Sequence, residues 1–365
     1  MAQRRTARAV VLEAPRHLAP RVFALPDLGD DDGLLRVEAC GLCGTDHEQF
    51  TGALPAGFAF VPGHEAVGVI EQVGPAAAER WGVNAGDRVA VEVFLSCREC
   101  ESCLAGEYRR CERHGLADMY GLQPVDKAPG LWGGYGQYQY LAPDSMLLPV
   151  PDGLDPVLAT VFNPLGAGVR WGAVIPGTGP GDVVAVLGPG IRGLSACVAA
   201  REAGAAFVMV TGYGEHDAPR LAVARDFGAD LAVDVATTDP ARALREATGG
   251  QADIVIDVTA KAPSALAQAV ALARPGGTIV IAGTRGSTET PGFVPDLIVY
   301  KELRIMGALG VDAPAYRTAL SILASGRWPF AELPREVASL DTVADLLLTM
   351  AGEGDVPPVH GVLVP

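Results

Sequence analysis

The sequence lacks any run of apolar residues long enough to cross a bilayer, although 49% of its 365 residues are hydrophobic. Its N-terminal segment is charged, and no long apolar stretch follows it before Glu13 and Pro15. We therefore expect neither a transmembrane helix nor a secretory signal, and we expect a cytoplasmic protein.

Positive charge is also scarce, because 28 Lys and Arg residues stand against 43 Asp and Glu residues, a net charge of −15. Such a chain repels phosphate backbones and anionic membrane surfaces, which argues against nucleic acid or a membrane as partner. Cysteine is sparse and odd in number, with seven residues. Without an export signal, this favours reduced thiols that act as ligands over a disulfide framework.

The length exceeds the size at which a single hydrophobic core stops growing, so we expect two domains. Forty-five glycines and 28 prolines indicate many turns. In the first half, short β-type runs such as 9–12, 34–39 and 61–70 alternate with Gly and Pro turns, which is typical of a β-rich, barrel-like domain.

The densest group of reactive side chains is the stretch from Cys40 to Glu48, which follows the predicted strand 34–39 and should form a loop at its end. Its reactive members are two thiols, a hydroxyl, an imidazole and carboxylates, namely Cys40, Cys43, Thr45, Asp46, His47 and Glu48. A lone Cys-x-x-Cys is more often a buried apolar pair than a ligand set. The Gly63-His64-Glu65 turn, however, supplies the nitrogen ligand that a zinc site with one thiolate needs.

A second cysteine group has the spacing C-x2-C-x2-C-x7-C and comprises Cys97, Cys100, Cys103 and Cys111. Four sulfurs form a closed tetrahedral site, which is structural because no position remains for a substrate. Charged residues surround these thiols, so a packed core of free cysteines is a poor alternative. The spacing differs from that of ferredoxins, and we favour zinc over an iron–sulfur cluster.

The second half begins with the continuous apolar run 183–187, which is typical of a strand buried on both faces of a parallel sheet. A G-x-G-x-x-G loop and a helical segment follow at once, and the loop comprises Gly188, Pro189, Gly190, Ile191, Arg192 and Gly193. Strand, glycine loop and helix in this order form a dinucleotide-binding fingerprint, in which the helix N-terminus faces the pyrophosphate. Further strands at 207–211, 231–233, 253–257 and 278–281 predict a doubly wound α/β domain.

Together these motifs resemble those of the zinc-dependent medium-chain alcohol dehydrogenase family over nearly the whole chain. The resemblance implies an α/β protein with a Rossmann-type doubly wound parallel sheet at 166–310. It also implies a β-rich GroES-like catalytic domain formed by 1–165 and 311–365, with a structural zinc lobe at 97–111.

The resemblance further implies that Cys43 and His64 bind a catalytic zinc ion and that Thr45 passes on the proton of the substrate oxygen. Asp46 would orient His64. Many relatives end the proton relay in a histidine five residues after the catalytic cysteine. Here Glu48 stands at that position and the histidine is His47, so the terminal group stays open.

The third ligand is also open, because relatives carry Cys or Glu where this chain has Asn163 before Pro164. The substitution removes one negative charge from the metal site. We therefore predict that Glu65 ligates the metal and that Asn163 is a weak or water-mediated neighbour.

The nucleotide preference depends on the end of the second strand, where Thr211-Gly212 stands in place of the usual ribose-binding Asp or Glu. Gly212 would leave room for a 2′-phosphate, and Arg220 could pair with it. The nearby Glu215 and Asp217 would repel a phosphate, so the prediction is NAD.

The predicted function is hydride transfer between NAD(P) and a secondary alcohol, polyol or sugar. Two alternatives remain: a zinc-free reductase of activated double bonds, and a non-catalytic protein that retains the fold. The substrate stays open, since Phe94, Leu95, Tyr120 and Trp132 could line an apolar pocket, whereas Glu48 and Gln49 could bind hydroxyl groups. The family also implies a homodimer or homotetramer, formed through a sheet edge near 297–300 or 305–307.

Overall fold

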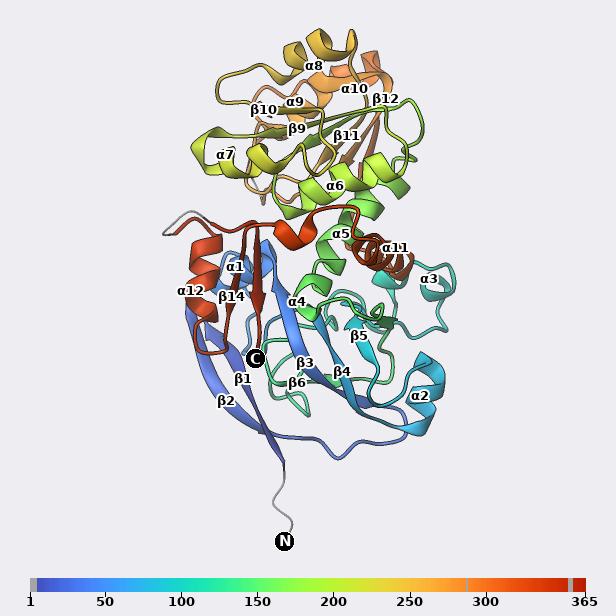
Figure 1. The fold of residues 1–365 in the computed structure, drawn as a ribbon, viewed down its shortest axis with the longest axis vertical. Coiled ribbons are helices and arrows are strands. Elements are labelled where there is room, and N and C mark those ends of the chain that lie inside the picture. Colours follow the sequence, from blue (N-terminus) through green and yellow to red (C-terminus); the bar gives the residue numbers. More distant parts are fainter. Residues whose placement is uncertain (1–4, 287, 354–356) are drawn as a thin grey trace. The chain divides into compact units, whose positions relative to one another are not determined.

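The computed structural model describes residues 5–286, 288–353 and 357–365, which form two compact units. The first contains residues 1–162 and 330–365, and the second contains residues 163–329. Figure 1 shows the second unit in green, yellow and orange and the first mainly in blue, cyan and red. Among the described residues, no helix combines the length and the apolarity that a membrane span requires.

The first unit is built around a seven-stranded sheet with the order β14-β15-β3-β4-β5-β7, in which β6 also pairs with β3. Its strands are β1 (Thr6–Ala14), β2 (His17–Ala24), β3 (Gly33–Leu42), β4 (Glu65–Val73), β5 (Arg88–Val91), β6 (Tyr138–Leu141), β7 (Leu147–Pro149), β14 (Arg335–Ala338) and β15 (His360–Leu363). Its helices are α1 (Gly44–Thr51), α2 (Pro75–Trp81), α3 (Glu101–Leu104), α4 (Pro156–Ala159) and α12 (Val343–Met350). Strands β1 and β2 form a separate antiparallel pair.

Strand β3 holds this unit together, because β4, β6 and β15 all pair with it in antiparallel register. Its burial pattern shows one exposed residue among ten, as expected for a central strand. The C-terminal strand β15 places Gly361 opposite Leu42, so the end of the chain completes the sheet beside the cysteine-rich stretch.

The second unit is a six-stranded parallel sheet with the order β10-β9-β8-β11-β12-β13. Its strands are β8 (Val183–Leu187), β9 (Phe207–Gly212), β10 (Leu231–Asp234), β11 (Ala252–Asp257), β12 (Ala273–Ile281) and β13 (Arg304–Gly307). Its helices are α5 (Phe162–Val169), α6 (Ile191–Glu202), α7 (Gly214–Val223), α8 (Pro240–Thr248), α9 (Ala265–Leu272), α10 (Asp296–Tyr300) and α11 (Ala313–Ala324). The order reverses direction at β8, which confirms the predicted doubly wound fold.

The boundary between the units differs from the predicted one, because 311–329 lies in the second unit and not in the first. Contacts around α5 explain the difference. The Arg170 side chain pairs with Asp312 at 2.8 Å, and Tyr316 of α11 packs so closely on Gly166 that a Cβ there would lie 2.4 Å from its ring. Helix α11 is thereby fixed to the second unit, and the return to the first unit begins at Phe330.

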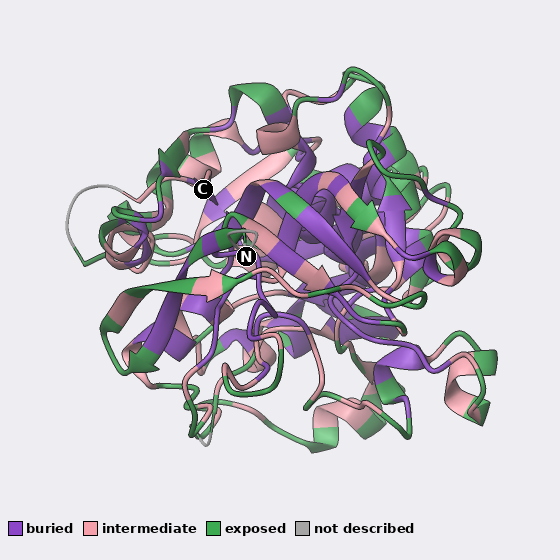
Figure 2. Cartoon of the chain, turned by 90° about the horizontal axis from the view of Figure 1, so that it is seen from below, coloured by how far each residue is buried: buried purple, intermediate pink, exposed green. Residues whose placement is uncertain are grey.

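The two units have separate hydrophobic cores. Figure 2 shows the buried residues in purple along the strands, with exposed residues on outer helix faces and loops. Tyr120, Trp132 and Leu95 are at most 5% exposed and belong to the core of the first unit, while Phe94 packs in a small cluster with Val93 and Tyr108. These residues, which the sequence left as candidates for a substrate pocket, are therefore core residues.

Candidate active site

The part of the Cys40–Glu48 stretch that follows β3 forms the start of helix α1 and not the predicted loop. Cys43 is the N-cap residue of α1, and its Sγ accepts a hydrogen bond from the Thr45 amide at 3.3 Å. The Asp46 carboxylate reciprocates by accepting from the Cys43 amide at 2.8 Å. These two contacts satisfy backbone N–H groups that a helix start leaves open, which explains why the helix begins here.

His64 and Glu65 reach the same place from the neighbouring strand. Strand β4 begins at Glu65, which lies opposite Gly41 in the antiparallel register with β3. The absence of a side chain at Gly41 makes room for Glu65, since a Cβ there would lie 2.3 Å from Glu65 Oε2. Ligand atoms of Cys43, His64 and Glu65 consequently lie within 4.8 Å of one another.

The imidazole of His64 lies beside the Asp46 carboxylate, with 3.5 Å between Nδ1 and Oδ1. Burial by itself lowers the pKa of His64, but the charge of Asp46 and the Cys43 thiol together raise that pKa well above 6.5. Burial and the nearby acids Asp46 and Glu65 also raise the pKa of the Cys40 thiol, which keeps this thiol protonated. The field at the site is therefore strongly negative.

The buried acidic groups show whether a cation fits the site. Asp46 and Glu65 are both 2% exposed, and the Cys43 thiol beside them is also buried. Burial and the acids Asp46, Cys43 and Glu65 also raise the pKa of the Tyr135 phenol, whose hydroxyl has no hydrogen-bond partner among the described residues. Buried anions are unfavourable unless a cation compensates them, so a divalent metal suits this group of thiol, imidazole and carboxylate.

The other residues predicted for the site, Thr45, His47 and Asn163, differ in their surroundings. Thr45 is half-buried in the first turn of α1. His47 lies 3.8 Å from Glu353, a carboxylate that also binds Arg16. Asn163 is buried in the second unit, where its amide nitrogen donates to the Tyr316 hydroxyl at 2.9 Å. An amide nitrogen does not ligate zinc, so the amide oxygen of Asn163 is the atom left for a metal ion.

The four-cysteine lobe is a second group with metal-ligand character. The sulfurs of Cys97, Cys100, Cys103 and Cys111 all lie within 4.8 Å of one another. The backbone N–H groups of Cys100 and Glu99 donate to Cys97 and lower its pKa to about 6, whereas burial raises the pKa of Cys103 to about 12. All four thiols are free, and their closeness fits a tetrahedral metal ion.

The glycine loop lies between β8 and α6 in the second unit, as the sequence predicts. Gly188 has φ +100°, which side chains rarely tolerate. Gly193 comes so close to the loop that a Cβ would lie 1.8 Å from the Gly188 oxygen. Gly190 caps α6, and Ile191 and Arg192 open the helix, so backbone N–H groups are directed at an anion position.

The space beside Gly212 differs from the prediction, because it is already filled. A Cβ at Gly212 would lie 2.9 Å from both the Asp217 Cβ and the Pro189 Cγ. Gly212 therefore does not leave the expected room for a 2′-phosphate. Arg220 is likewise engaged, since it pairs with Asp217 at 3.0 Å.

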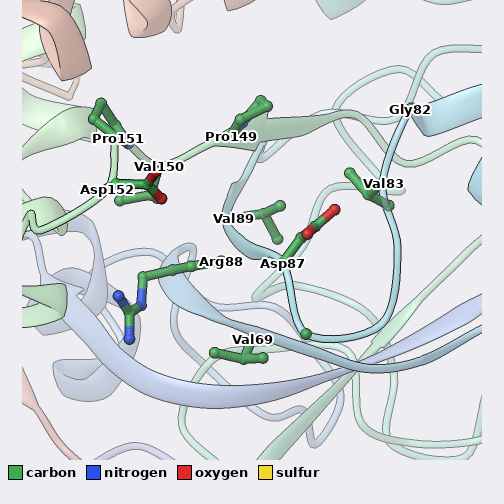
Figure 3. A pocket seen from close by; sticks show the side chains of 11 residues that line it. Val69, Gly82, Val83, Asp87, Arg88, Val89, Pro149, Val150, Pro151 and Asp152 are labelled. Atoms are coloured by element: carbon green, nitrogen blue, oxygen red, sulfur yellow. The ribbon is translucent and has the colours of Figure 1, made fainter.

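A cavity of about 440 Å³ is lined by Val69 in the middle of β4 and by residues of 82–89 and 149–152 (Figure 3). Val69 and Val89 are among its apolar lining residues, and Asp87, Arg88 and Asp152 are its charged ones. No residue of the predicted catalytic or metal sites lines it. It is therefore separate from the metal-ligand group.

Sequence reasoning missed the supporting residues Gly41, Tyr135 and Tyr316. The glycine at position 41 is a partial sequence signal, since a residue on β3 that faces Glu65 must be small to leave room for its side chain. Tyr135 and Tyr316 carry none, because their positions depend on segments far away in the chain.

Comparison with known proteins agrees with these features. A family model described as the alcohol dehydrogenase GroES-like domain matches residues 29–152, and one described as zinc-binding dehydrogenase matches residues 193–325.

Named relatives cover nearly the whole chain. A protein of Mycobacterium tuberculosis named a probable alcohol dehydrogenase is 69% identical over 98% of both chains. The sorbitol dehydrogenase of Bacillus subtilis is 30% identical over 93% of this chain and 92% of its own. A candidate zinc-binding dehydrogenase of Sinorhizobium meliloti, solved with bound NADP, is 28% identical with a TM-score of 0.83, covering 99% of this chain and 100% of its own.

Proposed function

The chain belongs to the zinc-binding alcohol dehydrogenases with a GroES-like domain, a family of nicotinamide-dependent oxidoreductases, and from this membership we propose a specific reaction and site. The reaction is the interconversion of a secondary alcohol, polyol or sugar with the corresponding carbonyl compound, with NAD as hydride acceptor. The observation that carries the proposal is the convergence of Cys43, His64 and Glu65 within 4.8 Å.

These three residues are the proposed protein ligands of a catalytic zinc ion. Cys43 as thiolate and Glu65 as carboxylate bring two negative charges, which balance a divalent cation. Asp46 lies beside His64 Nδ1 and would fix the tautomer that leaves Nε2 for the metal. Asn163 would at most contribute its amide oxygen to the zinc ion, directly or through water, because its nitrogen is hydrogen-bonded to the Tyr316 hydroxyl.

A bound zinc ion supplies Lewis-acid chemistry, and the nicotinamide accepts or donates the hydride. In this chain, Thr45 is the proposed group that takes the proton from the substrate hydroxyl. His47 stands two residues after Thr45 on α1, and its contact with the half-exposed Glu353 offers a path for the proton to solvent. Glu48, which stands where many relatives have histidine, is the alternative to His47.

The lobe from 97 to 111 is the proposed structural zinc site, with Cys97, Cys100, Cys103 and Cys111 as its ligands. The lobe offers little apolar area, and a metal would supply its cohesion. Four thiolates leave no open position, so this site takes no part in the reaction.

The glycine loop formed by Gly188, Gly190 and Gly193 is the proposed cradle of the pyrophosphate, together with the Ile191 and Arg192 amides at the start of α6. The acidic side chains near Gly212 favour NAD over NADP. Arg220, the cation that could accept a 2′-phosphate, is already paired with Asp217.

The substrate is a small molecule, and its class follows from relatives and from α1. Relatives at about 30% identity are named sorbitol dehydrogenase and erythritol/L-threitol dehydrogenase. On α1, Gln49 is 3% exposed and its Oε1 has no hydrogen-bond partner among the described residues. Together with Glu48, it offers hydrogen bonds to a substrate with several hydroxyl groups.

The proposed assembly is a homodimer or homotetramer in the cytoplasm. Strand β13 ends the sheet order, and an open strand edge is a template for pairing with a second copy. Helix α10 beside it exposes Val299 by 72% and Tyr300 by 76%, apolar area that a partner would cover.

The test of the ligand set is Glu65→Gln, which removes the charge and retains the shape. Zinc content should fall from about two to about one ion per chain, and turnover with NAD and a polyol should fall at least tenfold. Glu48→Gln is the matched control, because it neutralises a nearby carboxylate on α1 and should leave zinc content unchanged. Survival of both zinc content and activity in Glu65→Gln would remove Glu65 from the ligand set.

The same metal analysis separates the alternative functions. A zinc-free reductase would contain no zinc, and a non-catalytic protein with only the four-cysteine site would contain about one ion per chain. A substrate screen that follows cofactor absorbance then identifies the alcohol or carbonyl compound.

A further inference from the structure

The end of strand β9 lacks the acidic residue that usually binds the adenosine ribose of NAD. The strand ends at Gly212, which has no side chain, and helix α7 starts two residues later. The end of this strand nevertheless lies at the nucleotide position, because the Gly188 amide of the glycine loop donates to the Thr211 oxygen at 3.0 Å. The ribose hydroxyls of a dinucleotide would therefore be placed beside Gly212.

A carboxylate from another position occupies this place. The Asp217 side chain folds back over Gly212, with its Cβ 2.9 Å from where a Gly212 Cβ would stand. The Pro189 ring of the glycine loop lies equally close to the same point. The absence of a side chain at Gly212 therefore accommodates Asp217, which lies between the strand end and the loop that would hold the pyrophosphate.

The Asp217 carboxylate is fixed but not saturated. One of its oxygens accepts from the Tyr213 amide at 2.9 Å, and the other accepts from Arg220 Nη1 at 3.0 Å. Each carboxylate oxygen has capacity for a second hydrogen bond. The side chain is 19% exposed, so a ligand can reach it. The group is thus held in one orientation, with acceptor sites left for hydroxyl groups.

We propose that Asp217, on the first turns of α7, accepts hydrogen bonds from the adenosine ribose hydroxyls and excludes a 2′-phosphate. The proposal rests on the NAD-dependent function proposed above and assigns the residue that selects the cofactor. A carboxylate binds ribose hydroxyls by charge-assisted hydrogen bonds and repels a phosphate group at the same position.

The other charged residues nearby do not fit this role. Glu215 is exposed on the first turn of α7, and the atoms nearest to a Cβ at Gly212 belong to Asp217, Pro189 and Leu221. Asp234 at the end of β10 uses one oxygen on the Gly214 and Ala236 amides, which fixes the loop before α7. Arg220 pairs with Asp217, so its charge is balanced before any cofactor binds.

The experiment measures dissociation constants of NADH and NADPH for the zinc-loaded enzyme by titration calorimetry. Asp217→Asn retains the shape and removes the charge, and it should weaken NADH binding by about 10- to 100-fold. The same change frees Arg220, so NADPH binding should strengthen and the preference for NADH should narrow or reverse. Glu215→Gln is the matched control, because it removes the same charge from the same helix and should leave the ratio unchanged.

The outcomes separate this proposal from the proposed function. A wild-type enzyme that binds neither nucleotide overturns the proposed function and this assignment with it. A wild type that prefers NADPH overturns the NAD preference and the role of Asp217. A wild type that prefers NADH, with an unchanged ratio in Asp217→Asn, overturns the assignment alone. If Asp217→Asn fails to fold, Asp217→Ser keeps an acceptor for the Tyr213 amide and carries the same expectation.

Discussion

Glu92 is a buried carboxyl group whose ionisation should promote local opening around the four-cysteine lobe, because its charge is desolvated in the folded state. The residue follows β5 and is fully buried. Its carboxylate accepts from the Tyr108 hydroxyl at 2.6 Å and from the Phe94 amide at 3.3 Å. Tyr108 belongs to the lobe, so this hydrogen bond connects the lobe to the sheet.

The magnitude follows from the pKa of Glu92, which burial raises from 4.5 to about 7, although the Tyr108 hydrogen bond lowers it. The folded state thus binds a proton more tightly than the unfolded state does. Stability from this group is fully present below pH 4.5 and is lost as pH rises to about 7. At about 1.4 kcal/mol per pH unit, the full loss is of the order of 3 kcal/mol.

Glu92→Gln removes the ionisation while its amide oxygen can still accept from Tyr108. The variant should therefore be more stable than wild type at pH 8, by about 2 kcal/mol once the unpaired amide nitrogen is included. At pH 5 the stability difference between variant and wild type should vanish or change sign. Wild-type Glu92 is then largely protonated, whereas the variant still has an unpaired amide donor.

The assay is hydrogen exchange of peptides from 92–111, read by mass spectrometry at pH 5, 6, 7 and 8. Comparing variant and wild type at each pH cancels the intrinsic dependence of exchange, and the method reports local opening in a protein with two units. Glu101→Gln, which neutralises an exposed carboxylate of the same lobe, is the control and should show no trend. A difference between Glu92→Gln and wild type that stays constant from pH 5 to 8 would refute the reasoning.

Three further predictions concern the lobe, the C-terminal strand and the assembly. Cys103→Ser should lose one zinc ion per chain and melt at lower temperature because metal binding contributes to folding, and unchanged melting with the metal lost would contradict this. Burial and Arg335 lower the pKa of His360 to about 3, so wild type should lose stability as pH falls below 6.5. In chemical denaturation His360→Asn should lose less unfolding free energy than wild type as pH falls. An equal dependence of unfolding free energy on pH in the two proteins would contradict this prediction. Val299→Asp should shift the mass measured by light scattering from oligomer to monomer; a monomeric wild type would exclude that assembly.

The sequence alone predicted the parts of the molecule that are set by neighbours along the chain. The apolar run 183–187 followed by the glycine loop identified β8 and α6, because Gly193 must lie against Gly188 whatever the rest of the chain does. The spacing of the cysteines in 97–111 likewise brought four sulfurs together within one short lobe.

Residues from distant segments could not be placed in this way. The sequence favoured Glu65 as the compensating carboxylate, but it could not show how the Glu65 side chain comes to lie beside Cys43. The antiparallel register of β3 and β4 brings Glu65 into the group, and the missing side chain of Gly41 gives it space. The register follows from the pairing of whole strands and not from any local signal.

The same reason explains the other differences between expectation and structure. The sequence predicted open space beside Gly212 because glycine has no side chain. Asp217 follows five residues later, and only the return of α7 over the strand end brings its side chain into that space. The sequence assigned 311–329 to the first domain, yet Tyr316 packs on Gly166 and fixes α11 to the second unit. Local chemistry thus determined which ligand groups the chain carries, whereas long-range packing decided which of them meet, because such contacts form only when separate elements fold together.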